Sequence, residues 1–75
     1  MNVKELLMLA GAAFGPDWKV PMAEALGMSR EMMWRYEKEV TPISETVAGQ
    51  IRKICKVQIT KRIDHLKKVV ARIAA

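Results

Sequence analysis

The chain has 75 residues, of which 51% are apolar, so it is long enough for one small domain and too apolar for a disordered chain. Its net charge of +5 is uneven: residues 1–49 carry five basic and seven acidic side chains, and residues 50–75 carry eight basic side chains and only Asp64. A basic chain of this kind favours a polyanionic partner, such as nucleic acid or an acidic membrane surface.

Several classes of function lack the residues that they need. The single cysteine, Cys55, has no disulfide partner, and with one distant histidine, His65, it cannot form a zinc site. No glycine-rich phosphate loop or paired-carboxylate motif occurs, so we expect no enzyme, no metal and no cofactor. The apolar stretch 6–14 is too short to span a bilayer and Lys4-Glu5 is a poor signal-peptide leader, so we expect a cytoplasmic protein without a membrane partner.

Glycine and proline divide the chain, and the apolar residues between them have helical spacing, which predicts an all-α protein of five helices. The first should cover residues 2–13. The second should open at Asp17 or Val20, with Pro21 in its first turn, and end at Leu26 before Gly27. The third should cover residues 30–38, and the fourth should begin within residues 41–44. Three β-branched residues in KVQIT, residues 56–60, predict a break near 57–59 or one bent helix.

The second and third predicted helices are short and joined by a glycine-containing turn, which is the shape of a helix-turn-helix. The small side chain of Ala23 allows the next helix to cross closely over it. Gly27 relieves the turn, Ser29 suits the N-cap of the third helix, and apolar Met33 would hold that helix against the core.

The wider stretch MAEALGMSREMMWRYEKEVTPISETV, residues 22–47, resembles the Cro and lambda-repressor-like (xenobiotic-response-element type) helix-turn-helix family. In that family a segment L-A-x-x-L-G-[VM]-S-x-x-x-[IVM] is followed by a proline and then by E-T-[LV]. The resemblance covers residues 18 to about 56. It departs at Trp18-Lys19, where the family often has a Ser-Gln pair, and at Glu39, where it often has a glycine. It implies a lambda-repressor-like domain of a phage or bacterial DNA-binding regulator, associated with the nucleoid.

In helix-turn-helix proteins the N-terminal part of the second helix of the pair lies in the DNA major groove. We therefore expect Leu26, Met28, Met33 and Tyr36 to point inward. The expected base contacts are Arg30, Glu31, Met32 and Arg35, which suit guanine, cytosine, a thymine methyl group and guanine. The resemblance implies phosphate contacts for Lys19 and Lys38, and Ser29 and Thr41 complete the expected phosphate set.

An alternative interpretation of the same helix is a solvated surface with an Arg–Glu pair. Trp34 also has more than one interpretation. It would pack on the sugar-phosphate backbone, stack in a partner interface or fold over the fourth helix.

The C-terminal segment, residues 57–75, carries an apolar stripe spaced like a coiled-coil seam, formed by Ile59, Ile63, Leu66, Val70 and Ile73. The opposite face is basic, with Lys61, Lys67, Lys68 and Arg72. On a helical wheel this stripe is offset by about a quarter turn from Val47, Ile51, Ile54 and Cys55 of the fourth helix. We expect the stripe to pair with a second copy; core packing and binding to an acidic membrane are the alternatives.

Together these features predict a DNA-binding domain in residues 1–56 and a dimerisation helix in residues 57–75. The predicted function is a homodimeric transcriptional repressor that binds an inverted-repeat operator through residues 30–38 in the major groove. The alternative is an antitoxin-like or adaptor module whose C-terminal helix binds another chain.

Overall fold

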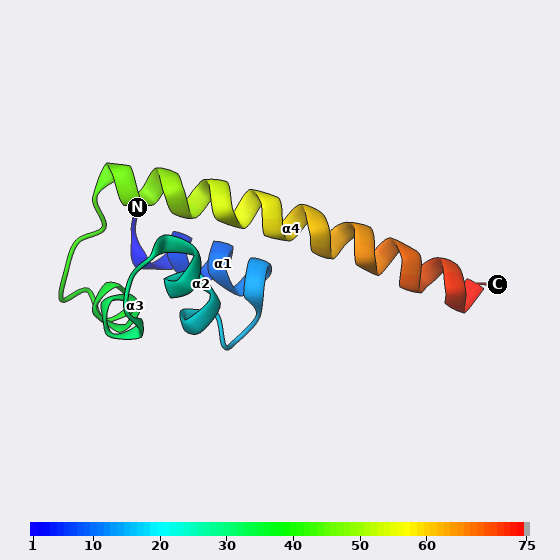
Figure 1. The fold of residues 1–75 in the computed structure, drawn as a ribbon, viewed down its shortest axis with the longest axis horizontal. Helices are drawn as coiled ribbons and strands as arrows, with labels where there is room; N and C mark the ends of the chain where they lie inside the picture. The colour runs from blue at the N-terminus through cyan, green and yellow to red at the C-terminus, as the bar shows by residue number, and fades with distance from the viewer. Residues whose placement is uncertain (75) are drawn as a thin grey trace.

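The computed structural model describes residues 1–74, which form four α-helices: α1 (Val3–Phe14), α2 (Lys19–Leu26), α3 (Arg30–Glu37) and α4 (Glu45–Ala74). The predicted all-α class is therefore confirmed. Figure 1 shows α1, α2 and α3 gathered on one side of the first half of α4, whose second half extends beyond them. We call α1, α2, α3 and residues 45–62 of α4 the body, and residues 63–74 the tail.

Local side-chain hydrogen bonds define where three of the helices begin. The Asn2 side chain accepts from the backbone N–H of Glu5 at 2.8 Å, and Ser29 Oγ accepts from the N–H of Met32 at 3.2 Å. Ser44 Oγ does the same for α4, accepting from Val47 at 3.2 Å. These bonds satisfy N–H groups that have no partner within the helix. The predicted N-cap at Ser29 is confirmed.

Two residues with positive φ end the short helices. Gly27, at φ 70°, follows α2, and the N–H of Met28 donates to the Ala23 carbonyl at 2.9 Å, so the predicted glycine at this helix end is confirmed. Glu39, at φ 59°, lies two residues beyond the last residue of α3. Side chains other than glycine are strained in this conformation, and this is the position where the resembling family often has glycine.

The expected count of five helices is wrong, because the last two predicted segments form one helix of 30 residues. Each β-branched residue at 57–60 costs only a few tenths of a kcal/mol in a helix, and no glycine or proline follows Gly49. Thr60 Oγ1 donates to the Lys56 carbonyl at 2.8 Å, so its hydroxyl is satisfied inside the helix. Packing of Ile54, Cys55 and Ile59 against the core further stabilises this region.

The core lies among the four helices: α1 and α2 pack against α4, and α3 packs against α1 and α2. Its buried side chains are Leu6, Ala10, Ala13, Trp18, Met22, Ala23, Met33, Tyr36, Ala48, Ile51 and Cys55. Burial raises the pKa of the Cys55 thiol, which keeps it neutral.

The buried residues of α4 also correct the predicted quarter-turn offset. Ala48, Ile51 and Cys55 are fully buried, whereas Val47 and Ile54 are only partly buried. At about 100° per residue, the three fully buried residues and the C-terminal stripe lie within about one third of the circumference of the helix. The core face and the stripe therefore form one continuous apolar face of α4.

Two arginines of α4 hold α1 at its two ends. Arg52 Nε donates to Glu5 Oε1 at 3.1 Å, and Arg52 Nη2 donates to Oε2 at 3.3 Å. This hydrogen-bonded guanidinium lowers the pKa of Glu5. Arg62 Nη1 donates to the Ala12 carbonyl at 2.9 Å. That carbonyl has no helical partner because the residue four positions later, Pro16, has no N–H.

None of the helices in the described part of the chain combines the length and the apolar character needed to cross a bilayer.

The conformation of Glu39 gives a prediction for stability. Glu39→Gly should raise the free energy of unfolding by about 0.5–1 kcal/mol, because removal of Cβ relieves more strain than the added flexibility of the unfolded chain costs. Glu24→Gly, at an exposed position within α2, is the matched control and should lower the same free energy by about 1 kcal/mol. Denaturant unfolding of both variants measures the difference, and a destabilised Glu39→Gly would contradict the prediction.

Candidate functional site

One side of α3 holds this helix against the core. Met33 and Tyr36 are buried, and the Tyr36 hydroxyl lies 4.0 Å from the sulfur of Met28. Ala23 of α2 is also buried. The predicted inward positions of Met33 and Tyr36 are thus confirmed, and Leu26 and Met28 are partly buried against the same core.

The other side of α3 is exposed and largely charged. Arg30, Glu31 and Arg35 all lie on the surface, as predicted. Met32 differs from the expectation, because its side chain is partly buried and packs against the core. The reason is that Met32 lies one helical turn before buried Tyr36, at the edge of the buried side of α3.

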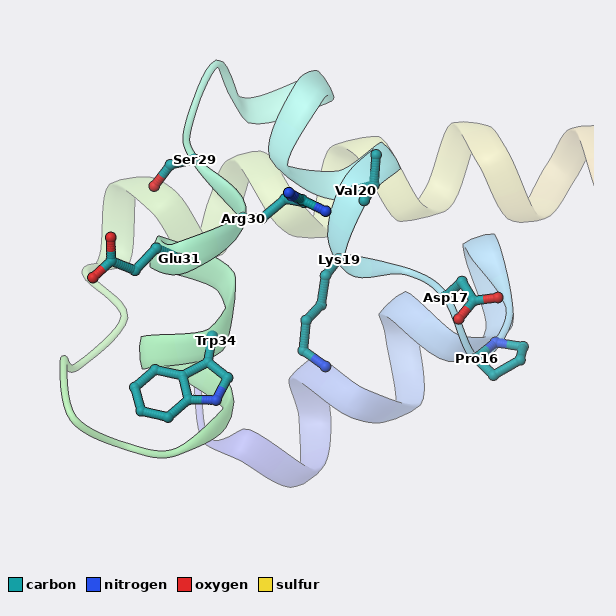
Figure 2. A pocket seen from close by; sticks show the side chains of 8 residues that line it. All are labelled: Pro16, Asp17, Lys19, Val20, Ser29, Arg30, Glu31 and Trp34. Atoms are coloured by element: carbon teal, nitrogen blue, oxygen red, sulfur yellow. The ribbon is translucent and has the colours of Figure 1, made fainter.

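An open groove of about 620 Å³ runs beside this exposed side of α3. Its lining residues come from the loop before α2, from the start of α2 and from the start and middle of α3: Pro16, Asp17, Lys19, Val20, Ser29, Arg30, Glu31 and Trp34. Figure 2 shows Lys19 and Arg30 between the two helices, with Trp34 and Glu31 on the α3 side. The groove therefore joins charged side chains to one large aromatic ring.

Trp34 has a defined place in this arrangement. Its side chain is 49% exposed, and no residue of α4 lines the groove that it borders. Trp18, by contrast, is buried in the core, which the sequence analysis did not anticipate. The two tryptophans therefore have separate roles: Trp18 packs into the core just before α2 begins, and Trp34 offers an aromatic surface to solvent.

Two of the candidate cations are already paired within the protein. Lys19 Nζ lies 3.1 Å from Glu37 Oε2, which ties the start of α2 to the end of α3, and 5.4 Å from the centre of the Trp18 ring. Arg35 Nη2 lies 3.2 Å from Glu31 Oε1, one turn away along α3. Within residues 1–74, Arg30 and Lys38 have no ion pair.

The four residues expected to contact phosphates do not all lie together. Lys19 and Ser29 line the groove with Arg30, and Lys38 is exposed at the end of α3. Thr41 is partly buried in the loop before α4, where its N–H donates to the Arg35 carbonyl at 3.4 Å and its side chain lines a different depression with Tyr36 and Pro42. The structure thus groups Lys19 and Ser29 with the predicted base-contacting residues and places Thr41 apart from them.

The apolar stripe of the C-terminal segment divides into two parts. Ile59 is partly buried against the core. Ile63, Leu66, Val70 and Ile73 are exposed, so core packing, the first alternative for the stripe, is wrong for these four residues. Val69 is a further exposed apolar residue beside them.

In the described part of the chain, no three His, Cys, Asp or Glu side chains lie close enough together to hold a metal ion. Comparison of the chain with models of protein families, with curated proteins and with solved structures finds no match in any of the three.

The position of α3 should depend on Met33. Met33→Ala should lower the free energy of unfolding by about 2–5 kcal/mol, because it leaves a cavity in the core. Met8→Ala is the matched control: the Met8 side chain is 65% exposed, and its removal should change that free energy by at most about 0.5 kcal/mol. Equal effects of the two substitutions in denaturant unfolding would show that Met33 does not anchor the helix.

Proposed function

We propose that this protein is a sequence-specific DNA-binding regulator of transcription that places α3 in the major groove, and that it acts as a homodimeric repressor on an inverted-repeat operator. The observation that carries the proposal is the division of α3 into two sides. Met33 and Tyr36 are buried in the body, while Arg30, Glu31 and Arg35 are exposed at the surface. A helix held firmly on one side and polar on the other suits readout of base edges.

The α2–α3 pair supports this proposal further. Gly27 and Met28 make the sharp turn, Ser29 caps α3, and Ala23 is buried beneath the crossing, which are the features that the resemblance to the Cro and lambda-repressor-like family led us to expect. An α-helix with its side chains is about 10–12 Å in diameter, so α3 can enter a major groove about 12 Å wide. We propose that α2 and α3 act as the helix-turn-helix.

The Glu31–Arg35 pair is compatible with base contacts. An exposed pair one helical turn apart contributes only about 0.3–0.5 kcal/mol, so DNA can displace it at small cost. Before DNA binds, the pair holds the Arg35 side chain along the outer side of α3. Arg35 then donates two hydrogen bonds to guanine, Glu31 accepts from cytosine, and Arg30 lies nearer the start of the helix.

The surroundings of α3 supply the backbone contacts. Ser29 and the positive end of α3 suit one phosphate, and exposed Lys38 suits another. Trp34 borders the groove that Lys19 and Ser29 also line, and its ring offers an apolar surface for a deoxyribose. Most of the positive charge lies on α4, where it steers the protein toward DNA without making specific contacts.

Homodimerisation supplies the second half of the recognition. A single short helix reaches only a few base pairs, and repressors of this type bind two half-sites about 34 Å apart. The exposed residues Ile63, Leu66, Val70 and Ile73 form the proposed dimer contact, with Ile59 at its edge. In the second candidate function, an antitoxin-like or adaptor module, the same exposed side of the tail binds a different chain.

The proposed base contact of Arg35 gives a prediction for binding specificity. The operator used in the test is the duplex that the wild-type protein enriches from a random pool. Arg35→Ala should weaken binding to this operator by about 1–3 kcal/mol, while non-specific binding changes little. Arg72→Ala removes the same charge from the exposed tail and is the matched control; it should leave the ratio of specific to non-specific affinity unchanged. Fluorescence anisotropy with operator and scrambled duplexes measures both affinities. An unchanged ratio for a folded Arg35→Ala protein would remove Arg35 from the site.

The proposed phosphate contact of Lys38 gives a prediction for the salt dependence of binding. Lys38→Ala should weaken binding to all duplexes equally and reduce the slope of log K against log salt concentration by about 1. Lys68→Ala, on the tail, is the matched control and should leave that slope unchanged. Titrations at several salt concentrations measure the slope, and equal slopes for wild type and Lys38→Ala would contradict the phosphate contact.

A further inference from the structure

The tail, residues 63–74 of α4, has an apolar side that no other part of the described chain covers. Its exposed apolar residues are Ile63, Leu66, Val69, Val70 and Ile73, and the last of these is 80% exposed. Figure 1 shows this part of α4 extending past the end of α1. The tail is a helix of twelve residues, about 18 Å long.

The tail's apolar side faces the same way as the core. The fully buried residues Ala48, Ile51 and Cys55 share about one third of the circumference of α4 with Ile63, Leu66 and Val70. Because α1 covers the buried part, a segment that packs on the tail lies next to the end of α1. Arg62 marks this end, since it donates to the Ala12 carbonyl in the last turn of α1.

We propose that the tail pairs with the tail of a second copy in antiparallel orientation. Ile63 of one copy then packs beside Ile73 of the second copy, and Leu66 packs beside Val70 of the second copy. The twelve-residue tails overlap over their full length. The two bodies lie at opposite ends of the pair. The inference gives a direction and a register to the homodimer in the proposed function and rests on that proposal.

Space for the bodies favours this orientation over a parallel one. In a parallel pair both bodies lie at the same end. Figure 1 shows α1 on one side of α4. Because that side is continuous with the apolar side of the tail, each α1 lies toward the second copy. The two α1 helices would then occupy the same gap just before Ile63. In the antiparallel pair the end of each α1 meets only the far end of the other tail.

The charges beside the stripe favour the same orientation. Arg62 and Val69 lie along one edge of the stripe, and Thr60, Lys67 and Ala74 lie along the other. In a parallel pair, the Arg62 edge of one copy meets the Lys67 edge of the second copy. Arg62 of each copy then faces Lys67 of the second copy, which brings two pairs of like charges together. In an antiparallel pair, each edge meets the same edge of the second copy. Val69 then faces Val69 of the second copy and adds apolar contact. Only one pair of like charges, Lys67 with Lys67 of the second copy, comes together.

The size of the contact sets its strength. Two helices of twelve residues bury less than the total of about 1,200 Å² that is typical of stable protein complexes. We therefore expect a monomer–dimer equilibrium that shifts with protein concentration, and sedimentation at rising concentration should show it. Leu66→Asp should keep the protein monomeric, whereas Lys68→Asp, on the side of the tail opposite the stripe, should leave the equilibrium in place.

Disulfide crosslinking tests the orientation directly. Two single-cysteine proteins are made in a Cys55→Ala background, one with Ile63→Cys and one with Ile73→Cys. They carry tags of different length, so that the crosslinked products can be told apart by size. The two proteins are mixed and oxidised in the absence of DNA. The antiparallel register places residues 63 and 73 together and keeps two copies of residue 63 roughly 15 Å apart, too far for a disulfide. We therefore expect the mixed disulfide alone. Parallel pairing would give only the two symmetric disulfides.

Each outcome decides the inference. Symmetric disulfides would overturn the antiparallel orientation, and a wild-type protein that stays monomeric at all concentrations would overturn the self-pairing itself. Neither result would touch the proposed DNA contacts of α3, because the Arg35→Ala comparison measures these separately. Conversely, a mixed disulfide in a protein that binds no duplex would leave the tail contact intact and overturn the proposed function.

Discussion

Burial of one side of α4 is the constraint on which the rest of this structure depends. The side that carries Ala48, Ile51 and Cys55 is covered by α1 and α2, and Arg52 and Arg62 hold α1 along it through Glu5 and the Ala12 carbonyl. Because α1 has 12 residues and α4 has 30, α4 extends beyond the end of α1. The same apolar side therefore continues into solvent. Residues 45–62 of α4 organise the body, and the tail is the proposed contact with a second copy.

The candidate DNA-binding side of α3 follows from the same core. Met33 and Tyr36 reach into it, and the Lys19–Glu37 ion pair ties the end of α3 to the start of α2. The buried side of α3 decides which side chains remain outside. The exposed side is modest in charge, because Glu31 pairs with Arg35. In the proposed function, such a surface favours selective contact with a few bases over strong general attraction, and the basic residues of α4 are proposed to supply the general attraction.

Sequence patterns predicted the features that depend on neighbouring residues. The turn at Gly27, the cap at Ser29 and the inward positions of Met33 and Tyr36 follow from spacing and local chemistry, and the structure confirms them. The break near residues 57–59 was not found, because packing outweighs a propensity cost of tenths of a kcal/mol. Burial of Trp18 and partial burial of Met32 depend on contacts between helices, which spacing within one helix does not reveal.

The central claim is that the protein recognises a particular DNA sequence through α3. Selection of bound duplexes from a random pool, followed by sequencing, tests it most directly. The account predicts enrichment of an inverted repeat, and it predicts that the preferred base pairs within each half-site change when Arg30, Glu31 or Arg35 is replaced. Enrichment of no sequence by the folded wild-type protein would contradict the account.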